Sequence, residues 1–428
     1  MAQQRIAAPV FDANLRMRTT VLVLATAFVI AVVPAVQAQT YSVIYFFQGT
    51  DTHENPTAGL TIDQAGHLYG TTYNIWGSVF EMRTVNSSWL FSTLLSLPSS
   101  GHEGLSPQGG VIKGPDGSLY STAIGGGEEG CLCGVVFKLQ PPATAPRSAL
   151  QQWTETVLYE FEGPGGKYPG YGNLVFDTAG NLYGTTEQGG ANDLGVVFEL
   201  SPVSGGWTET VIHTFSGNDG AEPYGGLTFD NAGNLYGTTH EGGVPGYGVV
   251  FELSPGNGGW TETVLHSFQN TDGKQPQGQL IFDASGNLYG TAYSGGLDNT
   301  SGSVLELSPS SGGWTFAVLH LFDFSAGEGA GPLAGVTMGS DGNLYGTTLG
   351  GGSGDNGTIY RLVNAGGSWT YQTLHSFVTV DGGAPFGAAP FGGVTFDSQG
   401  NMYGTTITGG QGQTYCTGGC GVVWKLTP

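Results

Sequence analysis

The sequence predicts an all-β protein, a seven-bladed β-propeller with four antiparallel strands in each blade and an N-terminal strand that completes the last blade. Three observations predict this fold. A heptapeptide of the form Gly-Asn-Leu-Tyr-Gly-Thr-Thr occurs seven times, with its tyrosines 51 to 63 residues apart. Each repeat holds four short runs rich in Val, Thr, Tyr and Phe, bounded by turn residues. The two ends of the chain carry complementary parts of one repeat.

The first segment, residues 1–38, has the order of a secretory signal peptide. Arginines precede an apolar run over residues 21–33, and small residues follow up to Ala38. The run is shorter than the about 20 residues that a membrane-spanning helix needs. We therefore expect cleavage after Ala38, no membrane span in the processed chain, and a secreted or cell-surface protein. Met17 is an alternative start, because the residues that follow it form a compact signal on their own.

The remaining residues, 39–428, are expected to form a single propeller. The repeat at residues 225–268 shows the four strands in order: "GLTFD", "NLYGTT", "VVFELSP" and "WTETVLHSF". Asp230 opens the first turn, where its carboxylate can accept backbone N–H bonds, and Gly233 supplies a positive φ. A residue that recurs in nearly every blade is expected to have a structural role that all blades share. The heptapeptide is therefore interpreted as scaffold, and the glycine after its tyrosine as a place of close backbone approach.

The two ends of the propeller predict how the ring closes. Residues 39–47, "QTYSVIYFF", align with the fourth strand of a repeat, and residues 421–428, "GVVWKLTP", form a third strand with no fourth strand after it. Residues 40–47 should therefore pair with residues 421–426. A β-solenoid is the alternative, but its coils need only about 20–30 residues per turn, and it would have no use for this offset.

The repeats also resemble a known family. The pattern "DGxxPxGxLxFDxxGNLYGTTxxGG…GVVFELSP…TVLHSF" resembles the GloVer tandem repeats of secreted bacterial proteins, over residues 40–428. The turn before the heptapeptide is also similar, more weakly, to turns in NHL-type and lactonase-like propellers. The resemblance implies an extracytoplasmic repeat protein, and it implies no catalytic residues.

Composition restricts the partners. The chain is glycine-rich, with 77 glycines in 428 residues, and acidic, with 11 Lys and Arg against 33 Asp and Glu and a net charge of −22. So few cations cannot neutralise a phosphate backbone, so no nucleic-acid partner is expected. An acidic surface suits a cation or a neutral ligand such as a glycan. We expect a monomer.

The cysteines are few and even in number, which favours disulfides in a secreted chain. The sequence CTGGC can close locally between Cys416 and Cys420, and Cys131 with Cys133 would form a tighter ring. A zinc site made from all four is disfavoured because the two pairs lie in different repeats.

Candidate binding residues lie in the loops that follow the second and fourth strands, because these loops vary while the scaffold repeats. Aromatic faces beside carboxylates suit sugars, and clustered carboxylates suit Ca²⁺, the only cofactor that these loops suggest. The predicted ligand-binding residues are Asp219, Glu222, Tyr224, Glu241, Tyr247, Asp272, Asp381 and Phe386. No catalytic residue is assigned. His240 breaks the repeat pattern and is one candidate general base, whereas the histidines that recur in the fourth strands are interpreted as packing residues.

Three functions compete. The first is a secreted, non-enzymatic binding or adhesion propeller that recognises a glycan or a surface partner through these loops. The second is a structural repeat protein of the cell envelope, and the third a carbohydrate- or lactone-active enzyme. Carboxylates that converge at the channel mouth with raised pKa values would favour the enzyme, whereas an aromatic-lined shallow groove would favour binding.

Overall fold

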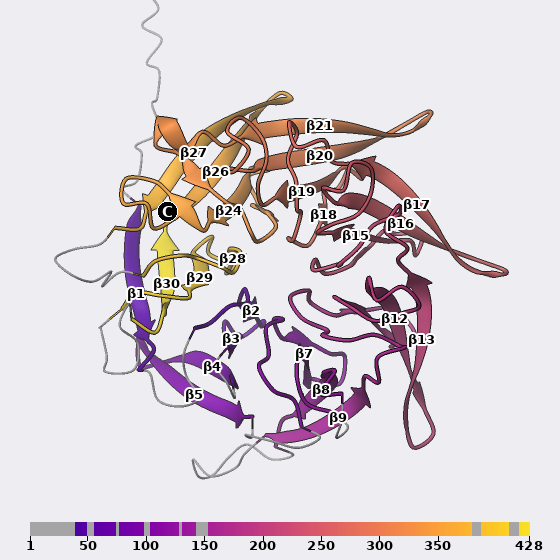
Figure 1. Ribbon diagram of the computed structural model, residues 1–428. Helices are drawn as coiled ribbons and strands as arrows, with labels where there is room; N and C mark the ends of the chain where they lie inside the picture. Colours follow the sequence, from indigo (N-terminus) through magenta and orange to yellow (C-terminus); the bar gives the residue numbers. More distant parts are fainter. Residues whose placement is uncertain are drawn as a thin grey trace, which may run out of the picture. The chain divides into compact units, whose positions relative to one another are not determined.

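The computed structural model divides the chain into two compact units, Met1–Ala38 and Gln39–Pro428. It describes residues 39–48, 55–73, 77–97, 103–127, 131–142, 153–378, 387–410 and 419–428, all of which belong to the second unit. Their strands form seven four-stranded antiparallel sheets. The sheets follow one another around a common centre, in chain order (Figure 1). The predicted seven-bladed β-propeller is confirmed.

The two inner strands of each blade are short. The innermost strands have two residues each and are β2 (Thr61–Ile62), β6 (Ile112–Lys113), β10 (Val175–Phe176), β14 (Thr228–Phe229), β18 (Ile281–Phe282), β23 (Thr337–Met338) and β28 (Thr395–Phe396). The second strands, which carry the heptapeptide, are β3 (Leu68–Thr72), β7 (Leu119–Ala123), β11 (Leu182–Thr186), β15 (Leu235–Thr239), β19 (Leu288–Ala292), β24 (Leu344–Thr348) and β29 (Met402–Thr406). Every residue of these second strands is buried, because both faces of a blade pack against a neighbouring blade.

The two outer strands are longer. The third strands are β4 (Ser78–Val85), β8 (Val135–Gln140), β12 (Val196–Val203), β16 (Val249–Gly256), β20 (Ser303–Ser310), β26 (Thr358–Ala365) and β30 (Val422–Thr427). The outermost strands of blades 1 to 7 are β5 (Ser88–Ser96), β9 (Thr154–Glu160), β13 (Gly206–Thr214), β17 (Gly259–Ser267), β21 (Gly313–Leu321), β27 (Ser368–Ser376) and β1 (Thr40–Phe46). A two-stranded sheet of β22 (Gly329–Ala330) and β25 (Gly350–Gly351) and a 3₁₀ turn, η1 (Phe324–Ala326), lie in loops. Within the described part of the chain, no helix has the length and apolar composition needed to cross a bilayer.

The N-terminal strand closes the ring, as predicted. β1 pairs antiparallel with β30, from Thr40 opposite Thr427 to Phe46 opposite Val422, with a bulge between Val43 and Tyr45. Figure 1 shows β1 and β30 side by side in this blade. The closure leaves the third strand of blade 7 with no free edge.

The hydrophobic core lies between blades rather than inside one of them. At the seam between blades 3 and 4, Tyr183 and Val197 of one blade pack against Leu227, Leu235 and Phe251 of the next. Similar clusters occupy the other seams. Each blade is therefore stable only with its neighbours, as expected for a repeat architecture.

The heptapeptide holds the scaffold together. In every blade its tyrosine hydroxyl donates a hydrogen bond to the aspartate of the preceding turn, at 3.1 Å from Tyr236 to Asp230 for example. The turn aspartate also accepts backbone N–H bonds, as Asp230 does from Ala232 and Asn234. In six of the seven blades the first threonine of the heptapeptide donates a hydrogen bond to the next blade, as Thr185 does to the carbonyl of Gly225 at 3.3 Å. The scaffold interpretation of the motif agrees with these bonds.

The glycine after the tyrosine has a different role from the one expected. A Cβ on Gly184 would lie 2.6 Å from the ring of Phe198, which is its partner on the third strand. The glycine thus makes room for a side chain of its own blade. Close backbone approach occurs instead around the central channel, where a Cβ on Gly172 would lie 2.6 Å from the backbone nitrogen of Gly226 in the next blade.

Candidate binding site at the channel mouth

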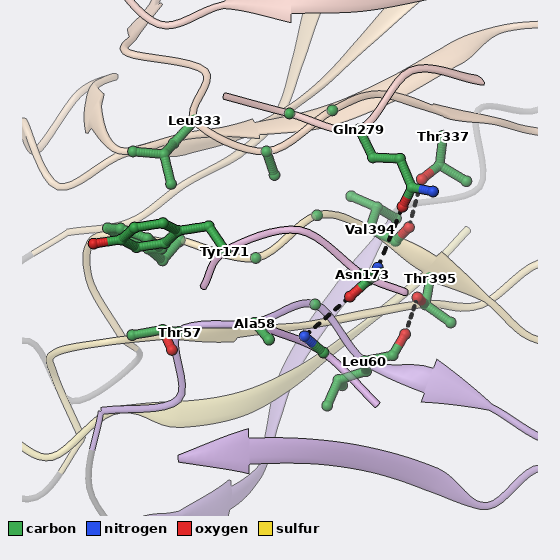
Figure 2. Close-up of a pocket in the computed structure, with 18 of the residues that line it drawn as sticks. Thr57, Ala58, Leu60, Tyr171, Asn173, Gln279, Leu333, Thr337, Val394 and Thr395 are labelled. Atoms are coloured by element: carbon green, nitrogen blue, oxygen red, sulfur yellow. Dashed lines mark hydrogen bonds between the residues drawn. The ribbon is translucent and has the colours of Figure 1, made fainter. Parts of the chain in front are cut away.

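The centre of the ring holds a cavity of about 220 Å³, lined by the segments that lead into the innermost strands. Two side chains of its lining are hydrogen-bonded to each other. Asn173 accepts a hydrogen bond from the backbone nitrogen of Gly110 (3.0 Å) and donates one to the Gln279 side chain (3.3 Å), and Gln279 donates to the carbonyl of Leu227 (2.7 Å). Figure 2 shows Tyr171 at one end of the cavity and this hydrogen-bonded chain farther along it. These bonds join the loops of four consecutive blades on one side of the cavity.

The mouth is built by one backbone arrangement that recurs in all seven blades. The residue before a proline in the loop leading to the innermost strand has a positive φ, as Glu222 does at 54°. Its carbonyl accepts a hydrogen bond from the first residue after the second strand, which is His240 in blade 4, at 2.9 Å. The remaining pairs are Asn55 with Tyr73, Ser106 with Ile124, Tyr168 with Glu187, Gln275 with Tyr293, Gly331 with Leu349, and Ala389 with Ile407. We call this arrangement the mouth clip. In each blade it joins the loop that leads to the innermost strand to the end of the second strand, through two residues of variable type.

In blades 3 and 4 the variable positions carry polar and aromatic groups that contact one another. The rings of Tyr171 and Tyr224 lie 5.0 Å apart at 56°, and the ring of Tyr224 lies 4.7 Å from that of His240. The Tyr224 hydroxyl donates a hydrogen bond to Glu222 at 3.5 Å, and Glu187 lies close enough for its negative charge to raise the pKa of Tyr224. Tyr171 is 38% exposed. We call this group, with the exposed Glu241 next to His240, the mouth cluster.

Burial and like charges shift the ionisation of the mouth cluster. Burial raises the pKa of Glu187. Burial also raises the pKa of Glu222, and the negative charges of Glu241 and Glu187 raise it further. The pKa of Tyr224 is raised by burial and then by Glu187 and Glu222, whereas burial lowers the pKa of His240. Burial thus disfavours the charged forms of these two carboxylates relative to those of exposed glutamates.

The structure brings together three of the predicted ligand-binding residues, Glu222, Tyr224 and Glu241, which belong to the mouth cluster. The carboxylates of Asp219 and Asp272 instead pair with histidines of the outermost strands: Asp219 lies 3.4 Å from His213, and Asp272 lies 3.0 Å from His266.

Three more predicted residues lie elsewhere in the chain. Tyr247 packs against the core at the seam of blades 4 and 5, with the ammonium of Lys274 at 6.0 Å from its ring centroid. Asp381 and Phe386 lie outside the described residues.

The recurring histidines join neighbouring blades along the outer rim. His266 stacks on Phe316 with ring centroids 3.5 Å apart, and His320 stacks on Tyr371 at 4.8 Å. In three other seams, the residue at the histidine position contacts the outermost strand of the next blade in a similar way. These pairs are Tyr159 hydrogen-bonded to Glu209, His375 stacked on Tyr41, and Tyr45 stacked on Phe91. These histidines pack in separate seams, as expected from their positions on different blades.

Sequence reasoning missed Glu187 and the Asn173–Gln279 bridge. Glu187 directly follows a heptapeptide, at the position that holds His240 in blade 4 and an apolar residue in three other blades. That change of residue type at one repeat position was the available signal. The bridge had no comparable signal, because it joins residues 106 positions apart in the sequence.

The cysteines are in disulfides where the structure describes them. Cys131 is bonded to Cys133. Cys420 is disulfide-bonded as well, and Cys416, its predicted partner, lies outside the described residues.

Two solved structures with TM-scores above 0.5 support the fold. An extracellular domain from B. thetaiotaomicron is 12% identical, with a TM-score of 0.52 over 91% of this chain and 42% of that chain. A protein from Lactobacillus plantarum is 14% identical, with a TM-score of 0.51 over 80% of this chain and 97% of that chain. A gluconolactonase from Xanthomonas campestris is 12% identical, with a TM-score of 0.42 over 89% and 97% of the two chains. A comparison with curated protein sequences gives no match.

The family assignment comes from the repeats themselves. The family model of the Gloeobacter/Verrucomicrobia repeat matches the chain twice in tandem, over residues 27–211 and 204–417. Together the two matches include most of every blade that the heptapeptides define. The chain therefore belongs to the Gloeobacter/Verrucomicrobia repeat family.

Proposed function

We propose that the protein is an exported carbohydrate-binding propeller and that the sugar binds at the mouth of the channel, over blades 3 and 4. The observation that carries the proposal is the half-exposed ring of Tyr171 against Tyr224, with the carboxylate of Glu222 hydrogen-bonded to the Tyr224 hydroxyl and the carboxylate of Glu187 close to both tyrosines. An aromatic face can contact the apolar C–H face of a sugar ring, and carboxylates accept hydrogen bonds from its hydroxyls.

The size of the cavity limits the ligand. Its about 220 Å³ is below the roughly 300–1,000 Å³ of pockets that enclose drug-sized ligands. The proposed ligand is therefore one sugar residue, such as the end of a surface glycan.

Export is part of the proposal. Residues 1–38 have the composition of a signal peptide. The disulfide between Cys131 and Cys133 fits an oxidising compartment, where such bonds persist.

The test is a glycan array probed with the wild-type protein, Tyr171→Ala and Phe324→Ala. Phe324 is also an exposed aromatic residue, at 47%, but it lies in η1 and not in the mouth cluster. We expect a defined set of bound glycans that Tyr171→Ala loses and Phe324→Ala keeps. Equal binding by both variants would contradict the proposed site, and an array without any bound glycan would contradict carbohydrate binding.

A carbohydrate- or lactone-active enzyme is the second candidate. The observation that favours it is the pair of carboxylates, Glu187 and Glu222, beside Tyr224, because burial raises the pKa of both and a raised pKa suits a carboxyl group to act as a general acid. Turnover of glycosides or lactones that is lost in both Glu187→Gln and Glu222→Gln would establish the enzyme. Binding without turnover leaves the first proposal in place.

A further inference from the structure

We propose that Glu222, His240 and Glu241 form a binding site for a divalent first-row transition metal ion, for which Zn²⁺ is the appropriate probe. One oxygen of each glutamate and one ring nitrogen of the histidine lie within 4.8 Å of one another. Zn²⁺ binds carboxylate oxygen and imidazole nitrogen at about 2.0–2.2 Å, so two donors on one ion lie at most about 4.4 Å apart. A small rotation of the exposed Glu241 side chain is enough to bring the three donors onto a common ion.

The histidine has a donor atom that is not otherwise used. Nδ1 of His240 is buried and makes no hydrogen bond to any described residue. It faces the Glu222 carboxylate at 3.6 Å, which is too long for a hydrogen bond. A buried imidazole nitrogen without a partner is unfavourable in the folded protein. A metal ion between Nδ1 and the carboxylate would satisfy both groups.

The backbone holds the three donors in place. Ala221 and Glu241 exchange two backbone hydrogen bonds of 2.9 and 3.0 Å, and the nitrogen of His240 donates to the carbonyl of Glu222 at 2.9 Å. These bonds join the loop that contains Glu222 to the loop that contains His240 and Glu241. The ligands therefore come from two loops that are already locked together, so little conformational entropy is lost when a metal binds.

Blade 5 has the same backbone without the ligands. Lys274 and Ser294 exchange backbone bonds of 2.8 and 3.1 Å, and Tyr293 donates to the carbonyl of Gln275. Gln275 also has a positive φ, 58° against 54° for Glu222. At the three equivalent positions blade 5 thus carries Gln275, Tyr293 and Ser294, which are all uncharged. The scaffold does not require acids or histidine here, so the two carboxylates and the imidazole of blade 4 are a local specialisation.

The donor set selects the kind of metal. Ca²⁺ takes six to eight oxygen ligands, whereas imidazole suits Zn²⁺ and its transition-metal neighbours. This site therefore differs from the calcium site expected from the loop acids, which stays a prediction. Three protein ligands leave at least one coordination position for water or another ligand. The inference does not depend on carbohydrate binding, because metal binding is measured directly.

The experiment is equilibrium dialysis of the chelator-treated full chain against micromolar Zn²⁺, with the bound metal counted. The main variant carries Glu222→Gln, His240→Tyr and Glu241→Ser, so that blade 4 has the residues that blade 5 already accommodates. His240→Gln alone tests the imidazole while both carboxylates stay. Asp219→Asn is the control, because this acid is close in sequence but pairs with His213. Circular dichroism and thermal melting check that each variant folds.

We expect one more Zn²⁺ bound per chain in the wild type and in Asp219→Asn than in the triple variant, and at least a tenfold weaker affinity in His240→Gln. A millimolar excess of Ca²⁺ should not displace this Zn²⁺. The proposal is wrong if the wild type binds no more Zn²⁺ than the triple variant, if His240→Gln binds as tightly as the wild type, or if Ca²⁺ displaces the metal.

Discussion

Thr405 of blade 7 donates a buried hydrogen bond of 3.0 Å to the backbone carbonyl of Ala58 in blade 1, which lies 347 positions earlier in the chain. Five other blades make the same contact with the blade that follows, from Thr71, Thr122, Thr185, Thr291 and Thr347. Blade 4 is the exception, because Thr238 has a buried hydroxyl with no hydrogen-bond partner among the described residues. The ring is thus closed near the channel by side-chain bonds and at the rim by β1.

This contrast gives a matched pair of substitutions. Thr405→Val should lower the free energy of unfolding by about 1–3 kcal/mol, because it leaves the buried carbonyl of Ala58 without its donor. Thr238→Val should be neutral or should raise the stability by up to about 1 kcal/mol, because it removes a buried hydroxyl that has no partner. Urea denaturation of both variants is the measurement. Equal destabilisation by the two substitutions would show that the inter-blade bond contributes nothing.

Removal of β1 should have a far larger effect. Val43 and Phe46 pack into the seam of blades 6 and 7, and Ile44 and Tyr45 pack into the seam of blades 7 and 1. At about 1.5–3 kcal/mol for each large apolar side chain that is buried, their loss is comparable to the about 5–15 kcal/mol of a whole domain. A chain that begins at Asp51 should aggregate or melt far below one that begins at Gln39.

The point substitution Ile44→Asp should act in the same direction, and Ser42→Asp is its control because Ser42 is exposed. Size-exclusion chromatography and thermal melting check both results. A monomeric shortened chain with an unchanged melting temperature would mean that ring closure by β1 is not needed for stability.

Glu262 should make the stability depend on pH. Burial, and then the charge of Asp219, raise its pKa to about 7, above the about 4.3 of an unfolded chain. Folding therefore favours the protonated form of Glu262. Its contribution to the free energy of unfolding is fully present below about pH 4 and is lost as the pH rises through about 7. Glu262→Gln keeps the shape and removes the charge. It should be more stable than the wild type at pH 8 by about 1–2 kcal/mol, less than the full shift implies because solvent screens a half-buried group.

The comparison at two pH values contains its own control. Denaturant unfolding at pH 4.5 should give a much smaller difference between Glu262→Gln and the wild type than unfolding at pH 8. A difference of the same size at both pH values would show that it comes from packing rather than from ionisation.

Export predicts a defined N-terminus. Mass spectrometry of material secreted by the producing cell should find a chain that begins at or near Gln39, because residues 1–38 have the order of a cleaved signal peptide. A mature protein that still contains residues 20–35 would contradict the signal peptide.

The fold could be predicted from the sequence because it repeats. Seven copies of one turn and strand, with Asp230 and Tyr236 as one example, identify the blade, and the offset between residues 39–47 and 421–428 identifies the closure. The mouth cluster could be predicted only in part. Asp219 and Glu222 look alike in the sequence, as acids of one loop, but one carboxylate pairs with His213 at the rim and the other with the mouth cluster. Which of the two acids belongs to the mouth cluster depends on the positive φ of Glu222 and on its backbone hydrogen bond with His240. Neither feature can be recognised from the types of residue in the loop.

The mouth clip has a consequence for how such proteins diversify. The bond between Glu222 and His240 uses main-chain atoms, and the same bond forms when the two residues are Gln275 and Tyr293 or Ala389 and Ile407. The two side chains can therefore change without affecting the bond that positions them. The mouth clip therefore provides seven equivalent pairs of positions, one pair in each blade. Substitutions at these positions can create a recognition site, move it to another blade or duplicate it, and they leave the fold intact. Exchange of loop pairs between blades is accordingly a direct route to new specificities on this scaffold.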